Sequence, residues 1–137
     1  MDRHAKFFVQ ASLIYLVIGA VLGVVMAVHE DWIFLFDSVH GHVNLVGFVS
    51  FMIFGVGYHI LPRFTGRPLY SVKLANFHVW LANIGLVGMS IFWVLEAGFK
   101  VYAFELIAGL FSIVLGVSMV VFVYNMWKSL IPLPQGE

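Results

Sequence analysis

The sequence predicts an all-α membrane protein, a four-transmembrane-helix antiparallel bundle, and three observations support this prediction. Hydrophobic residues make up 62% of the 137 residues and charged residues only 10%, whereas about a quarter of the residues of a soluble domain are charged. The apolar residues gather in four stretches without a charge, each long enough to cross a hydrocarbon core of about 30 Å as a helix. Short connectors between the stretches make consecutive helices antiparallel neighbours.

The first two helices are predicted on either side of an acidic connector at residues 30–38. The first, over about residues 7–29, has an apolar run longer than the core of a signal peptide, and no Ala-x-Ala cleavage site follows it. We therefore expect this helix to remain in the protein. The second, over about residues 39–61, ends where Pro62 opens a connector that is rich in arginine.

The third helix is predicted over about residues 74–95, between a lysine and a glutamate that mark its ends. The fourth is predicted over about residues 102–127, and its charge-free part begins at Leu106. The four helices use nearly the whole chain. We therefore expect residues 1–137 to form a single four-helix transmembrane domain without a soluble module.

The charged residues predict how the helices are oriented. Six of the seven basic residues lie on one side of the predicted membrane: Arg3, Lys6, Arg63, Arg67, Lys73 and Lys128. The other side carries Lys100 and the acidic residues Glu30, Asp31, Asp37, Glu96 and Glu105. Because basic loops stay in the cytoplasm, we expect a multi-pass protein of the cytoplasmic (inner) membrane with both termini cytoplasmic. The zero net charge and the dispersed basic residues predict no nucleic-acid partner.

Six histidines and the absence of cysteine restrict the chemistry that the chain can support. Without thiolates, a metal must be held by imidazole, carboxylate or carbonyl groups. His29, His40 and His42 are expected at the acidic ends of the first two helices. His59 and His78 are expected at the opposite ends, about 25 Å away along the helix, so the two groups cannot share an ion. For His59 and His78, the alternatives are interfacial hydrogen bonding and a proton-relay, metal or quinone role.

His40 and His42 point about 200° away from each other on a regular helix. One ion cannot bind both, but the pair suits two cofactors, or one cofactor on each flank of the helix. Neutral imidazole is an axial ligand of heme iron, and a flat apolar macrocycle fits between apolar helices. Two alternatives stay open. In the first, the glycines and imidazoles serve only helix packing. In the second, a transition metal such as copper is bound without heme by a wider set: His29, Asp31, Asp37, His40 and His42.

Residues 40–69, HGHVNLVGFVSFMIFGVGYHILPRFTGRPL, resemble the tenth helix of the catalytic subunit I of heme-copper oxidases. The likeness rests on the His-x-His pair that opens the helix, the later His and Pro, and Phe-Thr-Gly at residues 64–66. Residues 73–86, KLANFHVWLANIGL, are similar to the start of that family's next helix. The segment 42–45 is also similar to the second-helix heme motif of the related nitric oxide reductases. The specific resemblance covers residues 40–85.

The resemblance implies a fold like one four-helix arc of subunit I, with heme b as the cofactor. It implies that His40 ligates a high-spin heme and His42 a low-spin heme, one on each side of the helix. Asn44 belongs to the same motif and is expected beside the cofactor.

The sequence departs from the family at two points. The His-His pair and the His-linked Tyr of the family's copper centre are absent, so we expect an electron-carrying b-type cytochrome rather than a complete oxidase. A heme protein that binds nitric oxide or oxygen, or a small reductase, is the alternative and requires an open position on iron. The family's paired arginines for the heme propionates are absent as well, and Lys100, with His29 or Trp32, is the remaining candidate.

A homo-oligomer is expected because one chain offers too few imidazoles for bis-His ligation. Within the chain, His42 has as partners only His40, which points away, and His29, at a neighbouring helix end. The resembled family arranges twelve helices as a pseudo-threefold ring of four-helix arcs. We therefore expect a trimer, or else a dimer, in the lipid bilayer, with heme at each subunit interface. The sequence does not identify the redox partner.

Overall fold

The computed structural model describes residues 1–131, and within this range all regular secondary structure is helical. Four helical units are long and apolar enough to cross a membrane: α1 (Arg3–Val28), a continuous unit over Glu30–Phe64, α4 (Val72–Phe99) and α5 (Tyr102–Leu130). The prediction of an all-α membrane protein with four transmembrane helices is therefore confirmed.

The second unit is assembled from segments of different helical pitch: η1 (Glu30–Trp32), α2 (Ile33–His42), η2 (Val43–Ser50) and α3 (Phe51–Phe64). It begins before residue 39, where the sequence predicted its start. Glu30 and Asp31 occupy the first turn, where carboxylates are stabilised by the positive end of the helix dipole. The acidic residues that the sequence assigned to a connector therefore form the first turn of the helix.

The η2 segment is a π-helical stretch that directly follows His42. In such a wide turn, a backbone carbonyl accepts from a group five residues further along the chain. The backbone N–H of Phe51, which follows η2, donates to the carbonyl of Val46 five residues earlier, which matches this spacing. Because π-helical turns interrupt the regular register of a helix, η2 sets how α3 is rotated relative to α2.

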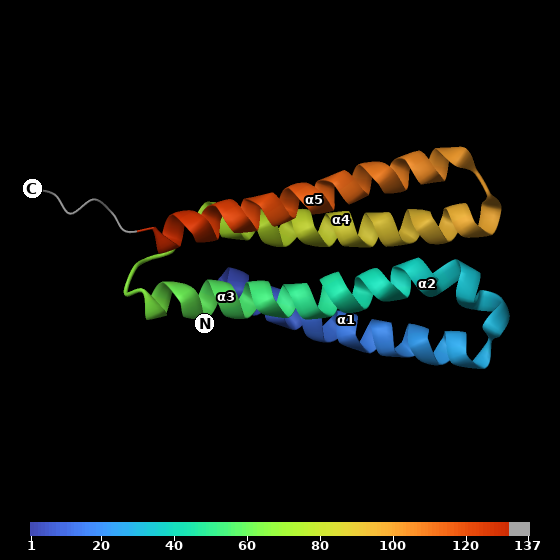
Figure 1. Ribbon diagram of the computed structural model, residues 1–137, viewed down its shortest axis with the longest axis horizontal. Helices are drawn as coiled ribbons and strands as arrows, with labels where there is room; N and C mark the ends of the chain where they lie inside the picture. Colours follow the sequence, from blue (N-terminus) through green and yellow to red (C-terminus); the bar gives the residue numbers. More distant parts are fainter. Residues whose placement is uncertain (132–137) are drawn as a thin grey trace, which may run out of the picture.

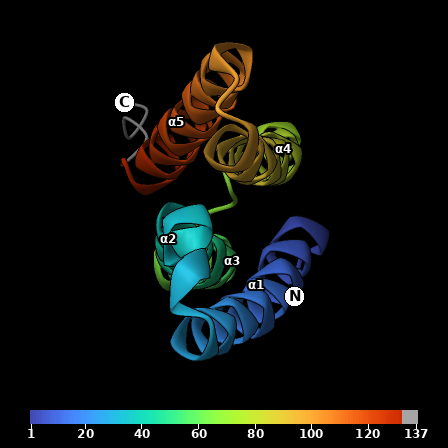
Figure 2. The same ribbon diagram turned by 90° about the vertical axis from the view of Figure 1, so that its right-hand side faces the viewer.

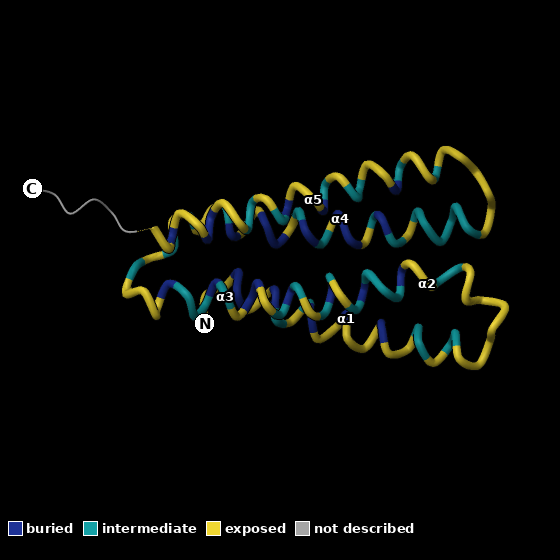
Figure 3. The backbone as a smooth tube through the Cα atoms, in the orientation of Figure 1, coloured by how far each residue is buried: buried dark blue, intermediate teal, exposed yellow. Residues whose placement is uncertain are grey.

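The helices form two antiparallel hairpins, α1 with α2–α3 and α4 with α5 (Figure 1). Seen along the bundle, the two hairpins lie one above the other (Figure 2). The helix α4 packs along α5 and also contacts α2 and α1, while α3 contacts α5. Buried residues face the space between the helices, and exposed residues cover the outside (Figure 3). Many of the exposed residues are large and apolar, such as Val17, Val24, Trp80, Ile113 and Val120, as a lipid-facing surface requires.

Aromatic side chains form the centre of the core, where α1, α3 and α4 meet. Phe8 contacts Phe51 and Phe54 edge-to-face, with ring centroids 5.2 and 5.6 Å apart. Tyr58 and Leu86 complete this buried cluster. Edge-to-face aromatic pairs stabilise a core beyond the area that they bury, so this cluster anchors the first hairpin to α4.

The two ends of the bundle carry the two kinds of charge that the sequence separates. We call the end with the α1–α2 turn and the α4–α5 turn the acidic end, and the opposite end the basic end (Figure 1). At the basic end, Asn125 of α5 accepts a hydrogen bond from the backbone N–H of Ser71 and donates one to its carbonyl, at 3.0 and 2.9 Å. Because Ser71 is the N-cap of α4, this contact fixes the start of α4 against the end of α5.

Candidate functional site

His42 lies in the last turn of α2 and is oriented by the backbone of its own helix. Its Nδ1 lies 2.9 Å from the carbonyl oxygen of Ser38. A carbonyl only accepts hydrogen bonds, so the proton of a neutral His42 must sit on Nδ1, and Nε2 keeps its lone pair. Metal-binding histidines in proteins typically donate their second ring N–H to a backbone carbonyl in this way. His42 is half-buried, and its ring packs edge-on against Trp93 of α4 at 4.8 Å.

His40 faces α1 instead. A Cβ atom added to Gly23 would lie 3.1 Å from Cε1 of His40, which means that the ring rests directly on the backbone of α1. One turn further along, the side chain of Asn44 fills the space beside Gly19 in the same way. The amide nitrogen of Asn44 lies 3.2 Å from Nε2 of His40 and donates to the His40 carbonyl at 3.0 Å. The two glycines of α1 thus make room for a His–Asn pair between the helices.

The two histidines of the His-x-His pair therefore contact different helices, His42 facing α4 and His40 facing α1. This divergence is what the helical spacing of the two residues predicts. A single small ion cannot bind both rings in this arrangement. The divergence also means that the two imidazoles are held differently, one by backbone and the other by a side-chain pair.

The remaining predicted residues lie at the acidic end. His29 ends α1, and its ring stacks on the exposed ring of Trp32, with centroids 5.4 Å apart. Lys100 follows α4 and adopts a left-handed conformation, with φ of 56°, in the turn to α5. Among residues 1–131, no three His, Asp or Glu side chains come together in a geometry that could hold a metal ion. The structure therefore does not assemble the set of His29, Asp31, Asp37, His40 and His42.

A cavity of about 460 Å³ opens at the acidic end, between α2, α4 and the start of α5. Ser38 and Trp93, the two contacts of the His42 ring, both line it, whereas His42 itself does not. Glu96 and Glu105 add two carboxylates to its wall. Nothing in the sequence singles out Trp93, because its contact with His42 joins two different helices. The Ser38 carbonyl could have been found, because it stands four residues before His42 on one helix.

The histidines of the basic end have different partners. His78 is fully buried, and its Nδ1 lies 3.1 Å from the hydroxyl of Tyr58. The rings of Phe8 and Phe54 pack on it at 4.6 and 4.9 Å. His59 instead faces Asp2, with 3.9 Å between Nδ1 and the carboxylate. Of the roles that the sequence left open for this pair, the contacts of His78 match interfacial hydrogen bonding.

Comparison with known proteins relates the chain to one family. No family model matches the chain. Subunit 1 of cytochrome c oxidase from Rhodobacter capsulatus is 32% identical over an alignment of 131 positions, which covers 78% of this chain and 24% of the relative. A cytochrome c oxidase subunit 1 homolog from Agrobacterium tumefaciens (strain T37) is 36% identical over an alignment of 98 positions, which covers 61% of this chain and 17% of the relative.

A third relative is subunit 1 of a quinol oxidase from Sulfolobus acidocaldarius, 40% identical over 58 residues, 42% of this chain and 11% of the relative. The chain thus spans less than a quarter of the length of these curated relatives. The family predicted from the His-x-His motif is confirmed, and the chain is a relative of subunit I of the heme-copper oxidases.

Proposed function

We propose that the protein is a membrane b-type cytochrome that carries electrons and binds heme through His42. The geometry of His42 carries this proposal: its Nδ1 is held by the Ser38 carbonyl, which leaves Nε2 as a ligand. The relatives named as cytochrome c and quinol oxidase subunits support it. Heme b would supply one-electron redox chemistry at this position, with a potential set by axial ligation, burial and hydrogen bonding.

His42 fits the role of a heme ligand, whereas the position of His40 in this chain does not. An imidazole held in one tautomer by a backbone carbonyl suits an axial ligand, and the two residues that it contacts, Ser38 and Trp93, line a cavity at the end of the bundle. Lys100, Trp32 and His29 remain the candidates for the propionates, since all three lie at the acidic end. His40 would have to leave its contact with Gly23 before it could bind iron, because the ring rests on α1.

The second axial ligand is therefore assigned to another copy of the chain. In this proposal a homo-oligomer, a trimer or else a dimer, places His40 of one copy near His42 of the next, after the His40 ring has left Gly23 of its own α1. Native mass spectrometry should then show heme only on oligomers. A heme-loaded monomer with intact bis-His ligation would contradict the arrangement and point to His29 as the missing ligand.

A gas-binding heme protein is the second candidate, because the packing of His40 on α1 can leave iron with a single protein ligand. Carbon monoxide separates the two, since six-coordinate bis-His iron resists it and five-coordinate iron binds it. The first measurement is a pyridine hemochromogen assay on the purified protein, which gives heme type and heme per chain. A colourless protein that contains copper or zinc would reject both candidates.

The assignment of His42 is tested with two variants. His42→Ala should lose heme or convert it to a five-coordinate high-spin form. His59→Ala, on the same span but at the basic end, should keep the Soret band, because about 25 Å of helix separates the two positions. A low-spin spectrum that survives in His42→Ala would reject the assignment.

We also propose that the protein lies in a bacterial-type inner membrane with both termini on the cytoplasmic side. This orientation follows from the distribution of the basic residues. The chain has no cysteine, so a single introduced thiol reports one position. Asp31→Cys places the thiol in the exposed η1 segment that opens the second helical unit, and Thr65→Cys places it in the exposed α3–α4 connector. An impermeant thiol reagent applied to intact cells should label only the former. Labelling of only the latter would invert the orientation.

A further inference from the structure

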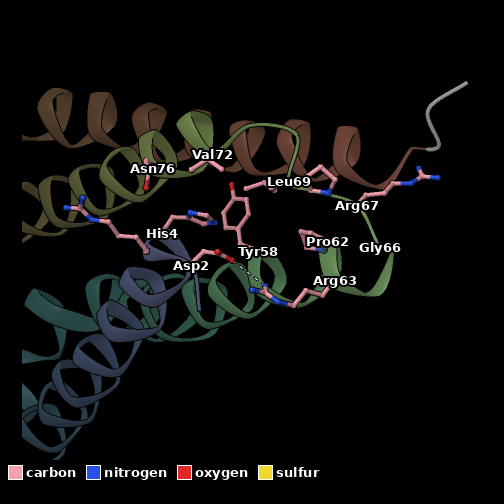
Figure 4. Close-up of a pocket in the computed structure, with 12 residues that line it drawn as sticks. Asp2, His4, Tyr58, Pro62, Arg63, Gly66, Arg67, Leu69, Val72 and Asn76 are labelled. Carbon is pink, nitrogen blue, oxygen red and sulfur yellow. Dashed lines mark hydrogen bonds and ion pairs between the residues drawn. The ribbon is translucent and has the colours of Figure 1, made fainter.

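A second cavity, at the basic end, is separate from the His42 region and has a volume of about 610 Å³. It is enclosed by the start of α1, the end of α3, the connector to α4 and the first turns of α4 (Figure 4). Its apolar wall includes Pro62, Leu69 and Val72. Because it lies where the helices end, it sits at the depth expected for lipid headgroups.

The charge of the lining is predominantly positive. Three arginines, Arg3, Arg63 and Arg67, line the cavity with one carboxylate, Asp2. Arg63 turns toward Asp2, with 3.4 Å between the guanidinium and the carboxylate, whereas Arg67 extends away (Figure 4). Burial acts to raise the pKa of Asp2, but the hydrogen bond and charge of Arg63 and the charge of His4 outweigh it, and the pKa is lowered. Arg63 thus stabilises the negative charge of Asp2.

His4 provides an independent indication that the cavity is built for a ligand. Its side chain lines the cavity and extends toward Tyr58, with ring centroids 5.3 Å apart (Figure 4). The residue is only 3% exposed, and within residues 1–131 its Nε2 is buried without a hydrogen-bond partner. Buried polar atoms are nearly always hydrogen-bonded, and because His4 is part of the cavity wall, a ligand in the cavity can supply the missing partner.

We propose that this cavity binds a phosphate group, either the phosphodiester of an anionic lipid headgroup or a free phosphate ion. Guanidinium groups match phosphate oxygens in geometry and charge, and basic pockets between transmembrane helices suit anionic headgroups. Arg67 swings inward to bind the phosphate oxygens, and Nε2–H of His4 donates a further hydrogen bond. Leu69 and Val72 contact the glycerol and the upper acyl chain when the ligand is a lipid.

Isothermal titration calorimetry on the full chain in a neutral detergent tests the proposal with three probes. These are a short-chain phosphatidylglycerol, a short-chain phosphatidylcholine and inorganic phosphate. We expect a single site for the phosphatidylglycerol or for inorganic phosphate. The phosphatidylcholine should bind at least about tenfold more weakly, because its ammonium group is repelled by the arginines.

Variants identify the site. Arg67→Gln should weaken binding about tenfold, through loss of a charge-assisted hydrogen bond. His4→Phe keeps a ring of similar size but removes Nε2, and should weaken binding to a similar extent without loss of stability. Lys128→Gln removes a positive charge at the same end, outside the cavity lining, and should change affinity less than about twofold. If circular dichroism shows that the Arg67→Gln variant does not fold, the Arg63→Gln variant is measured in its place.

The outcomes are decisive in each direction. If the phosphatidylglycerol binds and inorganic phosphate does not, the cavity is assigned to a lipid headgroup. If inorganic phosphate binds, and Arg67→Gln and His4→Phe weaken its affinity as predicted above, the cavity is assigned to the free ion. The proposal is overturned if neither probe binds the native protein. It is overturned as well if either the arginine variant or His4→Phe binds as tightly as the native chain, or if Lys128→Gln weakens binding as much as they do.

Discussion

The histidines at the two ends of the bundle are the same side chain in opposite environments. His78 is fully buried, hydrogen-bonded to Tyr58 and enclosed by the rings of Phe8 and Phe54. His42 is half-buried, held at one nitrogen by a backbone carbonyl and contacted by the edge of Trp93. The aromatic rings around His78 leave its Nε2 buried and, within residues 1–131, without a hydrogen-bond partner, and they close the imidazole off from an external ligand. An imidazole that is only half-buried and is fixed through Nδ1 keeps Nε2 available to a ligand.

The packing of α1 differs between the two ends in the same sense. At the basic half, a Cβ on Gly55 would lie 2.9 Å from the carbonyl oxygen of Ala5, so α1 and α3 are in backbone contact. At the acidic half, Gly19 and Gly23 of α1 meet the side chains of Asn44 and His40. Side chains can rotate away, whereas backbone cannot. We therefore expect the basic half to contribute most of the stability of the hairpin. The side chains that can change position, Asn44 and His40, lie in the acidic half.

The largest effect on stability is expected for His78→Ala, which leaves a cavity inside the aromatic cluster. It should lower the free energy of unfolding by about 3 kcal/mol while the heme content per folded chain stays unchanged. Chemical denaturation in detergent, followed by circular dichroism, measures the first quantity, and hemochromogen absorbance the second. Heme loss from a folded His78→Ala protein would break the comparison between the two ends.

Gly55→Ala tests the backbone contact between α1 and α3. The added methyl group meets Val9 and the Ala5 carbonyl, and should destabilise the protein by about 2 kcal/mol. Gly41→Ala is the matched control on the same span, because a Cβ there has no atom within 4 Å. Its effect should stay within about 1 kcal/mol and can be stabilising, since alanine favours helix. Equal thermal shifts in the two variants would contradict tight packing at the basic half.

Tyr58→Phe removes the hydroxyl that pairs with His78 and keeps the aromatic ring. It should destabilise the protein by about 1 kcal/mol, because Nδ1 of a buried imidazole loses its partner. The exposed Tyr102 offers a matched control in Tyr102→Phe, which should be neutral. If the two denaturation midpoints coincide, the hydrogen bond between Tyr58 and His78 does not stabilise the fold.

The smallest effect is expected at the surface pair of Asp2 and Arg63. The pKa of Asp2 is lowered in the folded chain by Arg63 against the opposing effect of burial, so its contribution is present at neutral pH. It is lost as the pH falls through the lowered pKa. For an exposed pair screened by solvent, Asp2→Asn should cost at most about 0.5 kcal/mol at pH 7 and nothing at low pH. If the difference in unfolding free energy between Asp2→Asn and the native chain became larger at low pH, the predicted pH dependence would be wrong.

Some features of the site follow from the sequence because they depend on local periodicity. The divergence of His40 and His42 requires only the pitch of a helix, and both rings do contact different neighbours. The start of the second span was predicted too late, because Glu30 and Asp31 favour a helix N-terminus as readily as a loop. Trp93 and Tyr58 escaped notice, since their roles depend on contacts between different helices.

The sequence by itself determined the fold class, the four spans and the separation of basic from acidic ends, because hydrophobic length and charge act locally along the chain. Only the tertiary structure decided which histidines are enclosed and which stay open. That depends on how the hairpins meet: Phe8 and Phe54 close around His78, while Gly23 admits His40. It also decided that Asp2 and His4 join Arg63 in one cavity, because packing alone brings the start of α1 to the end of α3.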